Sequence, residues 1–453
     1  MNLLADNFKK ILLLIVDFLL MFFSLWLALV IRHGSNYTFN LWDQHWQSFI
    51  ILYIFWGIIF YSFNLYNTRA NLYITALLTN LLRATFVNFL ISIIYFYLAA
   101  PDSNISPKTV LAINITIFTF IAFFWRRLFI TLSTTSNLQK NILIIGWDDV
   151  ITEMIEELPS YGYNIKTIFT DEKDFVKNLP IYRLNDLEKL PEIIRKEKIQ
   201  LIVLTNTIEH QIINQLFLML RLRINFINLT KFYEQVFSKV PLESINQSWF
   251  LENLSEGNKG FFEFLKRIFD ILFALTFSII SLPFIPFIML LVKLNSTGPI
   301  FFTQVRTGKD GREFKAIKFR SMYVNSENKG PMYAQENDPR VTKIGKFLRK
   351  TRVDEIPQLF NILKGEMSFI GPRPERPEFI KDLEVSLPFY RERLLVKPGL
   401  TGWAQINFPY AATIEENLKK LQYDLYYIKN RSLTLDLSIL LKTLNIIIKG
   451  AGR

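Results

Sequence analysis

The chain has 453 residues, half of them hydrophobic and 15% aromatic, and a formal net charge of +12. It contains no cysteine, which excludes disulfides, zinc–thiolate sites and thiol nucleophiles, and its three histidines (His33, His45 and His210) leave none for a catalytic triad or metal site in the C-terminal half. Because the basic residues lie beside long apolar runs, the charge favours an anionic membrane surface or substrate, and not nucleic acid, as the partner.

Residues 1–135 are predicted to form a four-span transmembrane region. The apolar runs are residues 11–31, 49–65, 84–100 and 110–125. Basic residues gather in the flanks that would share one side of a membrane, which places both ends of the region in the cytoplasm. These residues are Lys9, Lys10, Arg69, Arg83, Arg126 and Arg127, against only Arg32 and Lys108 on the other side. We interpret Asp17, inside the first run, as a packing partner within the bundle, with a functional intramembrane acid as the alternative.

Residues 136–255 alternate strand-like and helix-like segments. This alternation predicts a parallel, Rossmann-like α/β domain. The expected strands are residues 141–146, 165–170, 200–205 and 224–230, and the expected helices are residues 150–158, 187–198 and 211–222. After the first strand, Gly146 is followed by a tryptophan and two aspartates, whose bulk and charge oppose a pyrophosphate at the helix start. We therefore interpret the domain as structural or regulatory and do not expect it to bind NAD.

The third domain, residues 256–453, opens with a segment at residues 266–293 whose apolar run is residues 269–292. Pro283 and Pro286 interrupt the run, and each removes a helical hydrogen bond. Both flanks are basic, whereas a simple crossing should be asymmetric. We predict a re-entrant membrane helix that bends at Pro283 and returns to the cytoplasmic face; a kinked fifth span is the alternative. The last apolar segment, residues 433–449, fits a surface helix on the membrane or a core helix equally well.

The segment RKTRVDEIPQ, residues 349–358, sets two carboxylates among arginines. Asp354 and Glu355 precede a predicted helix that has Pro357 in its first turn and Gly365 just past its end. In an alternative register Thr351 caps the helix. Either register puts both acids near a helix N-terminus, which favours ionised carboxylates, as do the neighbouring arginines.

Other short motifs supply further cations between turns stiffened by glycine and proline. They are KFRSM with Lys318 and Arg320, NDPRVT with Asp338 and Arg340, and GPRPERPEF with Arg373 between two prolines. The planar guanidinium group suits bidentate phosphate contact. A solvated charged surface would explain any single cluster, but it explains less well why several recur.

Phosphoryl transfer needs positioning, charge neutralisation and usually Mg²⁺, and it does not need histidine. A carboxylate can attack phosphorus and form an acyl phosphate, and a second carboxylate can hold the metal ion through oxygen. The acidic pair therefore predicts one nucleophile and one metal ligand.

Together the motifs resemble the monotopic phosphoglycosyl transferases, or bacterial sugar transferases. The resemblance runs from Lys266 to Arg453 through KRIFD, SxGPIFFTQVRTGKDGREF, KFRSM, the segment from NDPRVT to PERPEF, VKPGLTGWAQIN and YDLYYIKNRSLTLD. The four preceding spans and the Rossmann-like domain resemble the large, exopolysaccharide-type members. The resemblance implies a mostly α catalytic domain with a re-entrant helix, here broken near Ser281 and Pro283.

The resemblance also implies a reaction at the inner face of the bacterial cytoplasmic membrane. A sugar 1-phosphate passes from a UDP-sugar to polyprenyl phosphate, usually undecaprenyl phosphate, and UMP leaves. Asp354 would be the nucleophile that carries the phosphosugar, and Glu355, with Asp354 beside it, would bind Mg²⁺. A homodimer is implied as well. Phosphate and uridine contacts are expected from Lys318, Arg320, Arg340, Arg349, Arg352, Gln358 and Arg373.

Two other functions fit parts of the sequence. A membrane glycosyltransferase would move the sugar without its phosphate and release UDP. A non-catalytic scaffold or sensor for polymer assembly would not need the intact acidic pair. Nucleic-acid binding lacks any recognised motif.

Overall fold

A computed structural model of the chain describes residues 2–66, 74–98, 108–135, 139–172, 176, 179–206, 208, 210–218, 224–254, 259–324, 326, 338–408, 411 and 413–448. Several features used above lie outside these residues. They are Arg69, the end of the third apolar run at residues 99–100, residues 219–222 of an expected helix, Lys449, and the domain limits at residue 136 and at residues 255–256.

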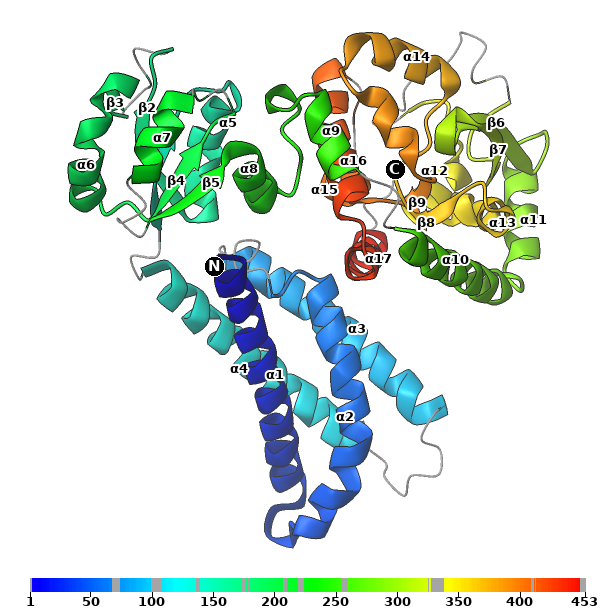
Figure 1. Cartoon of the computed structure of the whole chain (residues 1–453). Coiled ribbons are helices and arrows are strands. Elements are labelled where there is room, and N and C mark those ends of the chain that lie inside the picture. The colour runs from blue at the N-terminus through cyan, green and yellow to red at the C-terminus, as the bar shows by residue number, and fades with distance from the viewer. Residues whose placement is uncertain are drawn as a thin grey trace. The chain divides into compact units, whose positions relative to one another are not determined.

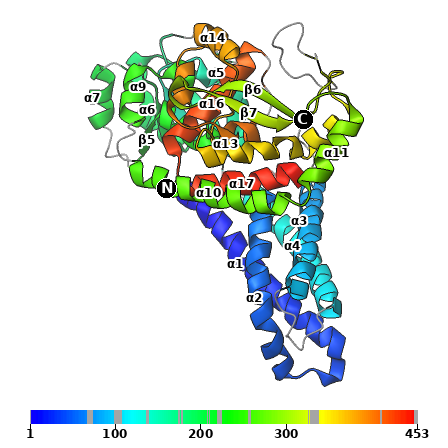
Figure 2. The same ribbon diagram turned by 90° about the vertical axis from the view of Figure 1, so that its right-hand side faces the viewer.

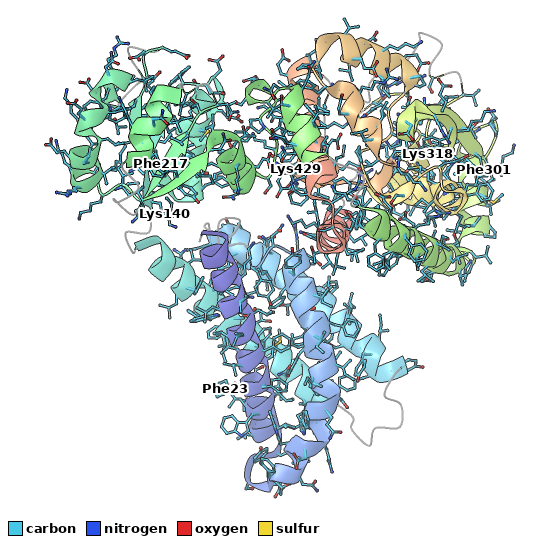
Figure 3. The ribbon with its side chains drawn as sticks, in the orientation of Figure 1. Phe23, Lys140, Phe217, Phe301, Lys318 and Lys429 are labelled. Atoms are coloured by element: carbon cyan, nitrogen blue, oxygen red, sulfur yellow. The ribbon has the colours of Figure 1, made fainter. Side chains whose placement is uncertain are left out.

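The N-terminal region is a bundle of four helices (Figure 1). They are α1 (Asn2–His33), α2 (Phe39–Ser62), α3 (Ile74–Leu98) and α4 (Lys108–Thr135). Each is long and apolar enough to cross a membrane, so the four predicted spans are confirmed as helices of suitable length and composition. Large apolar side chains such as Phe23 point away from the bundle (Figure 3).

Polar side chains tie the helices of the bundle together. Asn114 Nδ2 donates to Ser24 Oγ at 2.9 Å and to Tyr53 OH at 3.1 Å. Arg126 donates to both carboxylate oxygens of Asp17, at 2.9 and 2.5 Å, and both side chains are buried. This geometry is that of a packing partner: Asp17 is fully occupied in holding α1 to α4.

The middle of the chain forms a five-stranded sheet in the order β3-β2-β1-β4-β5. The strand pairs β2–β3 and β4–β5 are parallel, and this strand order is typical of doubly wound α/β domains. The strands are β1 (Lys140–Ile145), β2 (Tyr163–Phe169), β3 (Ile181–Tyr182), β4 (Leu201–Leu204) and β5 (Asn225–Asn228), and the helices are α5 (Val150–Glu157), α6 (Leu190–Lys196), α7 (His210–Leu218) and α8 (Leu229–Phe237). Strands and helices thus lie at the expected places as far as the described residues extend, but Leu229 and Thr230 already belong to α8, and the expected helix at 187–198 begins as a 3-10 turn.

The loop after β1 is explained by packing within the domain. Gly146 has φ +91°, and a Cβ there would lie 1.9 Å from Thr205 Oγ1, so only glycine fits. Asp148 Oδ1 accepts from Val150 N at 3.1 Å and from Ser244 Oγ at 2.8 Å. Asp148 therefore caps α5 and holds a neighbouring turn.

The C-terminal part combines short strands with many helices. Its elements are α10 (Gly260–Ser281), α11 (Ile285–Asn295), β6 (Phe301–Thr307), β7 (Glu313–Phe319), α12 (Lys343–Lys350), α13 (Leu359–Lys364), β8 (Ser368–Ile370), α14 (Pro377–Ser386), β9 (Gly399–Thr401), α15 (Trp403–Asn407), α16 (Ile414–Asn430) and α17 (Leu433–Ile448), preceded by α9 (Gln247–Asn253). β6 and β7 form an antiparallel hairpin, and β8 pairs with β9 in parallel. Val240 and Leu242 lie in the same apolar cluster as Leu359 and Leu425, so this core recruits residues from before 256.

The helix α10 buries polar side chains and exposes apolar ones. Its buried residues, spaced one helical turn apart, are Lys266, Asp270 and Ala274, while most of its large apolar side chains are exposed. Lys266 Nζ donates to Asp436 Oδ2 of α17 at 2.6 Å, and Asp270 Oδ1 accepts from Phe369 N of β8 at 2.9 Å. Polar contacts hold α10 to the protein, and its apolar side faces the surroundings, as expected where lipid is the solvent.

A break separates α10 from α11. The two helices meet at an angle of 66° across residues 282–284, which include Pro283. Ser281 Oγ donates to Ser278 O at 3.1 Å, and Ser281 O accepts from Phe284 N at 2.9 Å, which closes the turn. The bend lies where the prolines predict it, and it fits a re-entrant helix or a kinked fifth span.

The helix α17, predicted either for the membrane surface or for the core, has features of both. Ile439 and Asn445 are buried, whereas Leu437 is 56% exposed and Leu444 is 44% exposed. Figure 2 shows α17 running alongside α10, in agreement with the Lys266–Asp436 ion pair. The two helices together present an apolar surface.

The Asp17–Arg126 pair leads to a prediction about stability. Replacing Arg126 alone by methionine leaves a buried carboxylate without a partner, which should destabilise the bundle by about 3–5 kcal/mol. Replacing both residues, Asp17→Leu with Arg126→Met, should recover most of this loss. The measurement is thermal unfolding of the full chain in detergent; a double variant as unstable as the single one would contradict the assigned role.

Candidate active site

The centre of the site is the carboxylate of Glu355, which holds three cations. Glu355 is only 5% exposed. Its Oε1 accepts from Lys318 Nζ at 2.8 Å and from Arg373 Nη2 at 3.1 Å, and its Oε2 accepts from Arg352 Nη1 at 3.3 Å. Burial alone would raise the pKa of Glu355, but the three cations outweigh it and hold the pKa well below its usual range. Glu355 is therefore ionised, and its charge is used to position cations.

Asp354 differs from its neighbour although both are 5% exposed. Its carboxylate accepts no hydrogen bond and forms no ion pair with any residue that the structure describes. The pKa of Asp354 lies above its usual value: burial raises it, the cations Lys318 and Arg349 lower it, and the negative charge of Glu355 raises it again. The oxygens of Asp354 thus have no partner among the described residues, and the cations beside them can hold a second anion.

The backbone before the pair differs from the expected helix start. Thr351 does not cap a helix that follows; its hydroxyl donates to Phe347 O at 2.9 Å, because Thr351 ends α12. Arg352 then takes a left-handed conformation, with φ +59°, and a short 3-10 turn, Val353–Gln358, carries both acids and Pro357. Gly365 ends α13 with φ +85°, as predicted. The Thr351 register is thus wrong, and the acids lie in a 3-10 turn before the α-helix.

The strand β7 presents Lys318 to Glu355. Lys318 lies opposite Phe302 in the hairpin, and Lys318 is labelled in Figure 3. Asn361 of α13 fastens the strand, because its Oδ1 accepts from Ile317 N at 3.2 Å and its Nδ2 donates to Lys315 O at 2.8 Å. Asn361 was not predicted from the sequence, although its amide stands among the apolar residues of QLFNILK and could have indicated a buried polar contact.

The loop that carries Arg373 is held in place by Arg393, which belongs to a buried ion pair. Arg393 Nη2 donates to Arg373 O at 2.9 Å and pairs with Asp424 at 3.0 Å, and both partners of that ion pair are 2% exposed. The loop also approaches the backbone near β9, because a Cβ at Gly371 would lie 2.3 Å from Lys397 O. Arg393 was not singled out from the sequence, since its role depends on contacts with residues far along the chain.

A third carboxylate, Glu375, lies two residues beyond Arg373. It forms an ion pair with Lys420 and lies 3.8 Å from Arg306 Nη1. Burial alone would raise the pKa of Glu375, but Lys420, Arg393 and Arg306 lower it to about 2. This cluster anchors the loop and does not meet the acidic pair directly.

The other expected site residues make separate contacts of their own. Arg349 Nε donates to Ser321 Oγ at 2.8 Å while its charge acts on Asp354. Gln358 is buried at the end of the 3-10 turn. Arg320 donates to Ser296 O at 2.7 Å and so holds the end of α11. Arg340 is paired with Asp338 at 2.5 Å.

The acidic pair could hold Mg²⁺ through a limited set of oxygens. Mg²⁺ is commonly bound by one or two carboxylates together with waters and substrate phosphates. Glu355 Oε1 already accepts two hydrogen bonds, but Oε2 accepts only one, and both oxygens of Asp354 accept none from the described residues. Within the described part of the chain no group of three His, Cys, Asp or Glu side chains surrounds a common point. A cation bound here would therefore be held by this pair, with the substrate supplying further oxygens.

Comparison with known proteins identifies the family. A family profile described as "Bacterial sugar transferase" matches residues 261–450. A Bacillus subtilis protein named "Uncharacterized sugar transferase EpsL" is 40% identical over 192 residues, which cover 42% of this chain and 89% of that protein. The chain belongs to the bacterial sugar transferase family.

Longer relatives carry names that specify a reaction. An Aeromonas hydrophila protein, "UDP-N-acetylgalactosamine-undecaprenyl-phosphate N-acetylgalactosaminephosphotransferase", is 48% identical over 212 residues, covering 45% of this chain and 49% of the relative. An Escherichia coli protein, "UDP-glucose:undecaprenyl-phosphate glucose-1-phosphate transferase", is 44% identical over 181 residues, covering 40% of this chain and 39% of the relative. The matched region spans about half or less of these two proteins.

Glu375 gives a prediction about pH and stability. Its pKa of about 2 in the folded protein lies below the 4.5 of an ordinary glutamate, so its contribution to stability is present above pH 4.5 and is lost as the pH falls toward 2. Glu375→Gln should therefore lower the unfolding temperature at pH 7 and lower it less at pH 4. The measurement is thermal unfolding in detergent at both pH values.

The control is Glu378→Gln, because Glu378 is 58% exposed and lies on the same segment. It should change the unfolding temperature little at either pH. A deficit for Glu375→Gln that is the same at both pH values would contradict the prediction.

Proposed function

We propose that the protein transfers a sugar 1-phosphate from a UDP-sugar to polyprenyl phosphate, most directly undecaprenyl phosphate, and releases UMP. The observation that carries the proposal is the unequal acidic pair: Glu355 accepts hydrogen bonds from three cations, and Asp354 accepts none from the described residues although it lies beside the same cations. Membership of the sugar transferase family and the printed names of the relatives support the choice of donor and acceptor.

The first step is attack by an Asp354 oxygen on the phosphorus that bears the sugar. The bond from this phosphorus to the oxygen that bridges the two phosphates breaks, and UMP leaves with the electron pair. Lys318, Arg349 and Arg352 lie where they can offset the charge on the phosphate oxygens. A Mg²⁺ ion held by the pair would supply further charge neutralisation.

The second step regenerates the carboxylate. An oxygen of polyprenyl phosphate attacks the same phosphorus, and the bond between Asp354 and phosphorus breaks. The products are a polyprenyl diphosphosugar and free Asp354. Because both substrates use one site in turn, ping-pong kinetics follow.

The membrane explains why the enzyme has this architecture. Polyprenyl phosphate cannot leave the bilayer and a UDP-sugar cannot enter it, so the site must lie near the headgroup plane. We propose that α10 and α11 form a re-entrant hairpin in the inner leaflet, which keeps the site on the cytoplasmic face; the exposed apolar side of α10 and the 66° break support this arrangement. We further propose a homodimer that acts at the first membrane step of exopolysaccharide, O-antigen or capsule synthesis.

The decisive assay gives the purified full chain a panel of UDP-sugars with Mg²⁺ and undecaprenyl phosphate, followed by nucleotide analysis. Wild-type protein should release UMP with at least one sugar. Asp354→Asn should lose more than about 1,000-fold in rate, because an amide does not serve as the nucleophile.

The matched control is Asp382→Asn on α14, an exposed aspartate outside the site, which should keep wild-type activity. Release of UDP would instead identify a glycosyltransferase. Full product formation by Asp354→Asn would overturn the assigned mechanism.

A further inference from the structure

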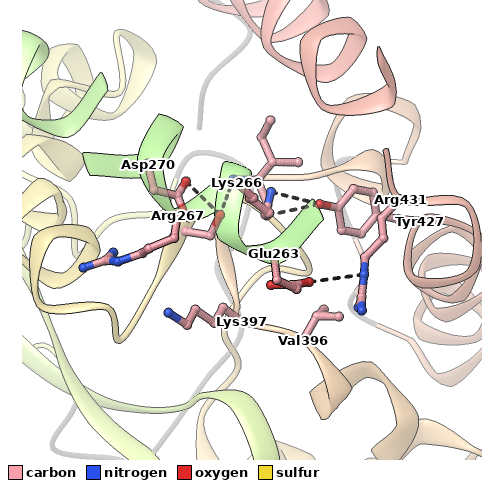
Figure 4. Close-up of a pocket in the computed structure, with 10 residues that line it drawn as sticks. Glu263, Lys266, Arg267, Asp270, Val396, Lys397, Tyr427 and Arg431 are labelled. Carbon is pink, nitrogen blue, oxygen red and sulfur yellow. Dashed lines mark hydrogen bonds and ion pairs between the residues drawn. The ribbon is translucent and has the colours of Figure 1, made fainter. Parts of the chain in front are cut away.

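A pocket of mixed charge opens beside the start of α10 and takes no part in the transfer described above. Its charged lining comprises Glu263, Lys266, Arg267, Asp270, Lys397 and Arg431 (Figure 4). The charges that shift the pKa of Asp354 come from other residues. Along the chain, the six-residue helix α13, about 9 Å long, leads from the 3-10 turn that carries the acidic pair to Gly365, which lies beside two of these cations.

Two of the four cations in the pocket are paired with carboxylates. Lys266 Nζ lies 2.6 Å from Asp436 Oδ2, and Arg431 Nε lies 3.3 Å from Glu263 Oε1. These pairs join α10 to the end of the chain. Their charges are compensated within the protein.

The other two cations, Arg267 and Lys397, have no such partner among the described residues. Arg267 donates to two carbonyl oxygens at the end of α13, Ile362 O at 2.6 Å and Leu363 O at 2.7 Å, and forms no ion pair. Lys397 makes neither a hydrogen bond nor an ion pair with any described residue. Figure 4 shows both side chains pointing to the same side of the pocket, away from the Glu263–Arg431 pair.

Gly365 lies beside these two cations. A Cβ on Gly365 would lie 3.5 Å from Arg267 Nη2 and 3.5 Å from Lys397 Nζ, so both nitrogens lie on the same side of Gly365. An anionic oxygen held between the two nitrogens, clear of Gly365, could accept a charge-assisted hydrogen bond from each. Burial and the charge of Arg267 lower the pKa of Lys397, whereas Asp270 and Glu263 raise it, and the net shift is downward. A bound anion would offset the repulsion between Lys397 and Arg267.

The place of this pair on the molecule indicates which anion is available. Arg267 lies in the first turns of α10, whose apolar side chains Phe264 and Leu272 are 62% and 55% exposed. If α10 enters the inner leaflet, as proposed above, then Arg267 and Lys397 lie at the level of the lipid headgroups. Acyl chains could extend along the exposed face of α10 below them.

We propose that Arg267 and Lys397 bind the phosphate of an anionic membrane phospholipid beside Gly365. The bound lipid fixes the depth of α10, and through α13 the depth of the acidic pair. The proposal rests on the membrane insertion of α10 but not on the chemistry at Asp354.

The test reconstitutes the full chain in nanodiscs of phosphatidylcholine with one-fifth phosphatidylglycerol and counts the lipids retained after gentle extraction by native mass spectrometry. Wild-type protein should retain phosphatidylglycerol in excess of its share. Lys397→Gln should reduce this excess at least threefold, whereas Lys397→Arg, which keeps the charge, should restore it. The charge-matched control is Lys381→Gln, an exposed lysine on α14, which should match wild-type protein.

Two further experiments are needed. One distinguishes a lipid phosphate from a soluble phosphate, and the other distinguishes the lipid site from the proposed function. Glycerol 1-phosphate at millimolar concentration should not displace the lipid; displacement would identify a site for soluble phosphate and overturn the proposal. Asp354→Asn should retain phosphatidylglycerol as the wild-type protein does while losing transfer. An unchanged excess in Lys397→Gln would refute the lipid site and leave the proposed function to be judged by UMP release alone.

Discussion

The site depends on one electrostatic arrangement, the buried carboxylate of Glu355 in contact with Lys318, Arg352 and Arg373. Three cations so close together would repel one another strongly in a poorly solvated place, and the carboxylate offsets that repulsion. It also fixes where three separate parts of the chain meet: strand β7, the left-handed turn at Arg352 and the proline-flanked loop at Arg373. Because Glu355 fills this role, the neighbouring Asp354 accepts none of these hydrogen bonds. Adjacent acids of the same chemical type thus have different surroundings.

The features that could be predicted from the sequence are those determined by near neighbours. The acidic pair and Arg352 lie within four residues of one another, so their proximity follows from the chain itself. The membrane spans and the break at Pro283 follow from composition and from the missing proline donor. The expected parallel strands follow from their apolar runs and the helices between them.

The features that could not be predicted depend on contacts between distant segments. Asn361 and Arg393 hold the site by contacts to Lys315 and Arg373, at separations of 46 and 20 residues, and nothing local in their motifs indicates these partners. Thr351 was a reasonable N-cap by type, but it ends α12 instead, and Arg352 must then take a positive φ to turn the chain. Arg320 lies in a basic motif that suggests phosphate, yet its guanidinium group holds Ser296.

The most direct test of the account is to locate the covalent intermediate. The full chain is mixed with Mg²⁺ and a UDP-sugar that supports UMP release, without polyprenyl phosphate, and is then quenched in acid and analysed by peptide mass spectrometry. The account predicts that the added mass of one sugar phosphate lies on Asp354, and that it disappears when polyprenyl phosphate is supplied. An adduct on Glu355, or full turnover by a protein that never carries an adduct, would contradict it.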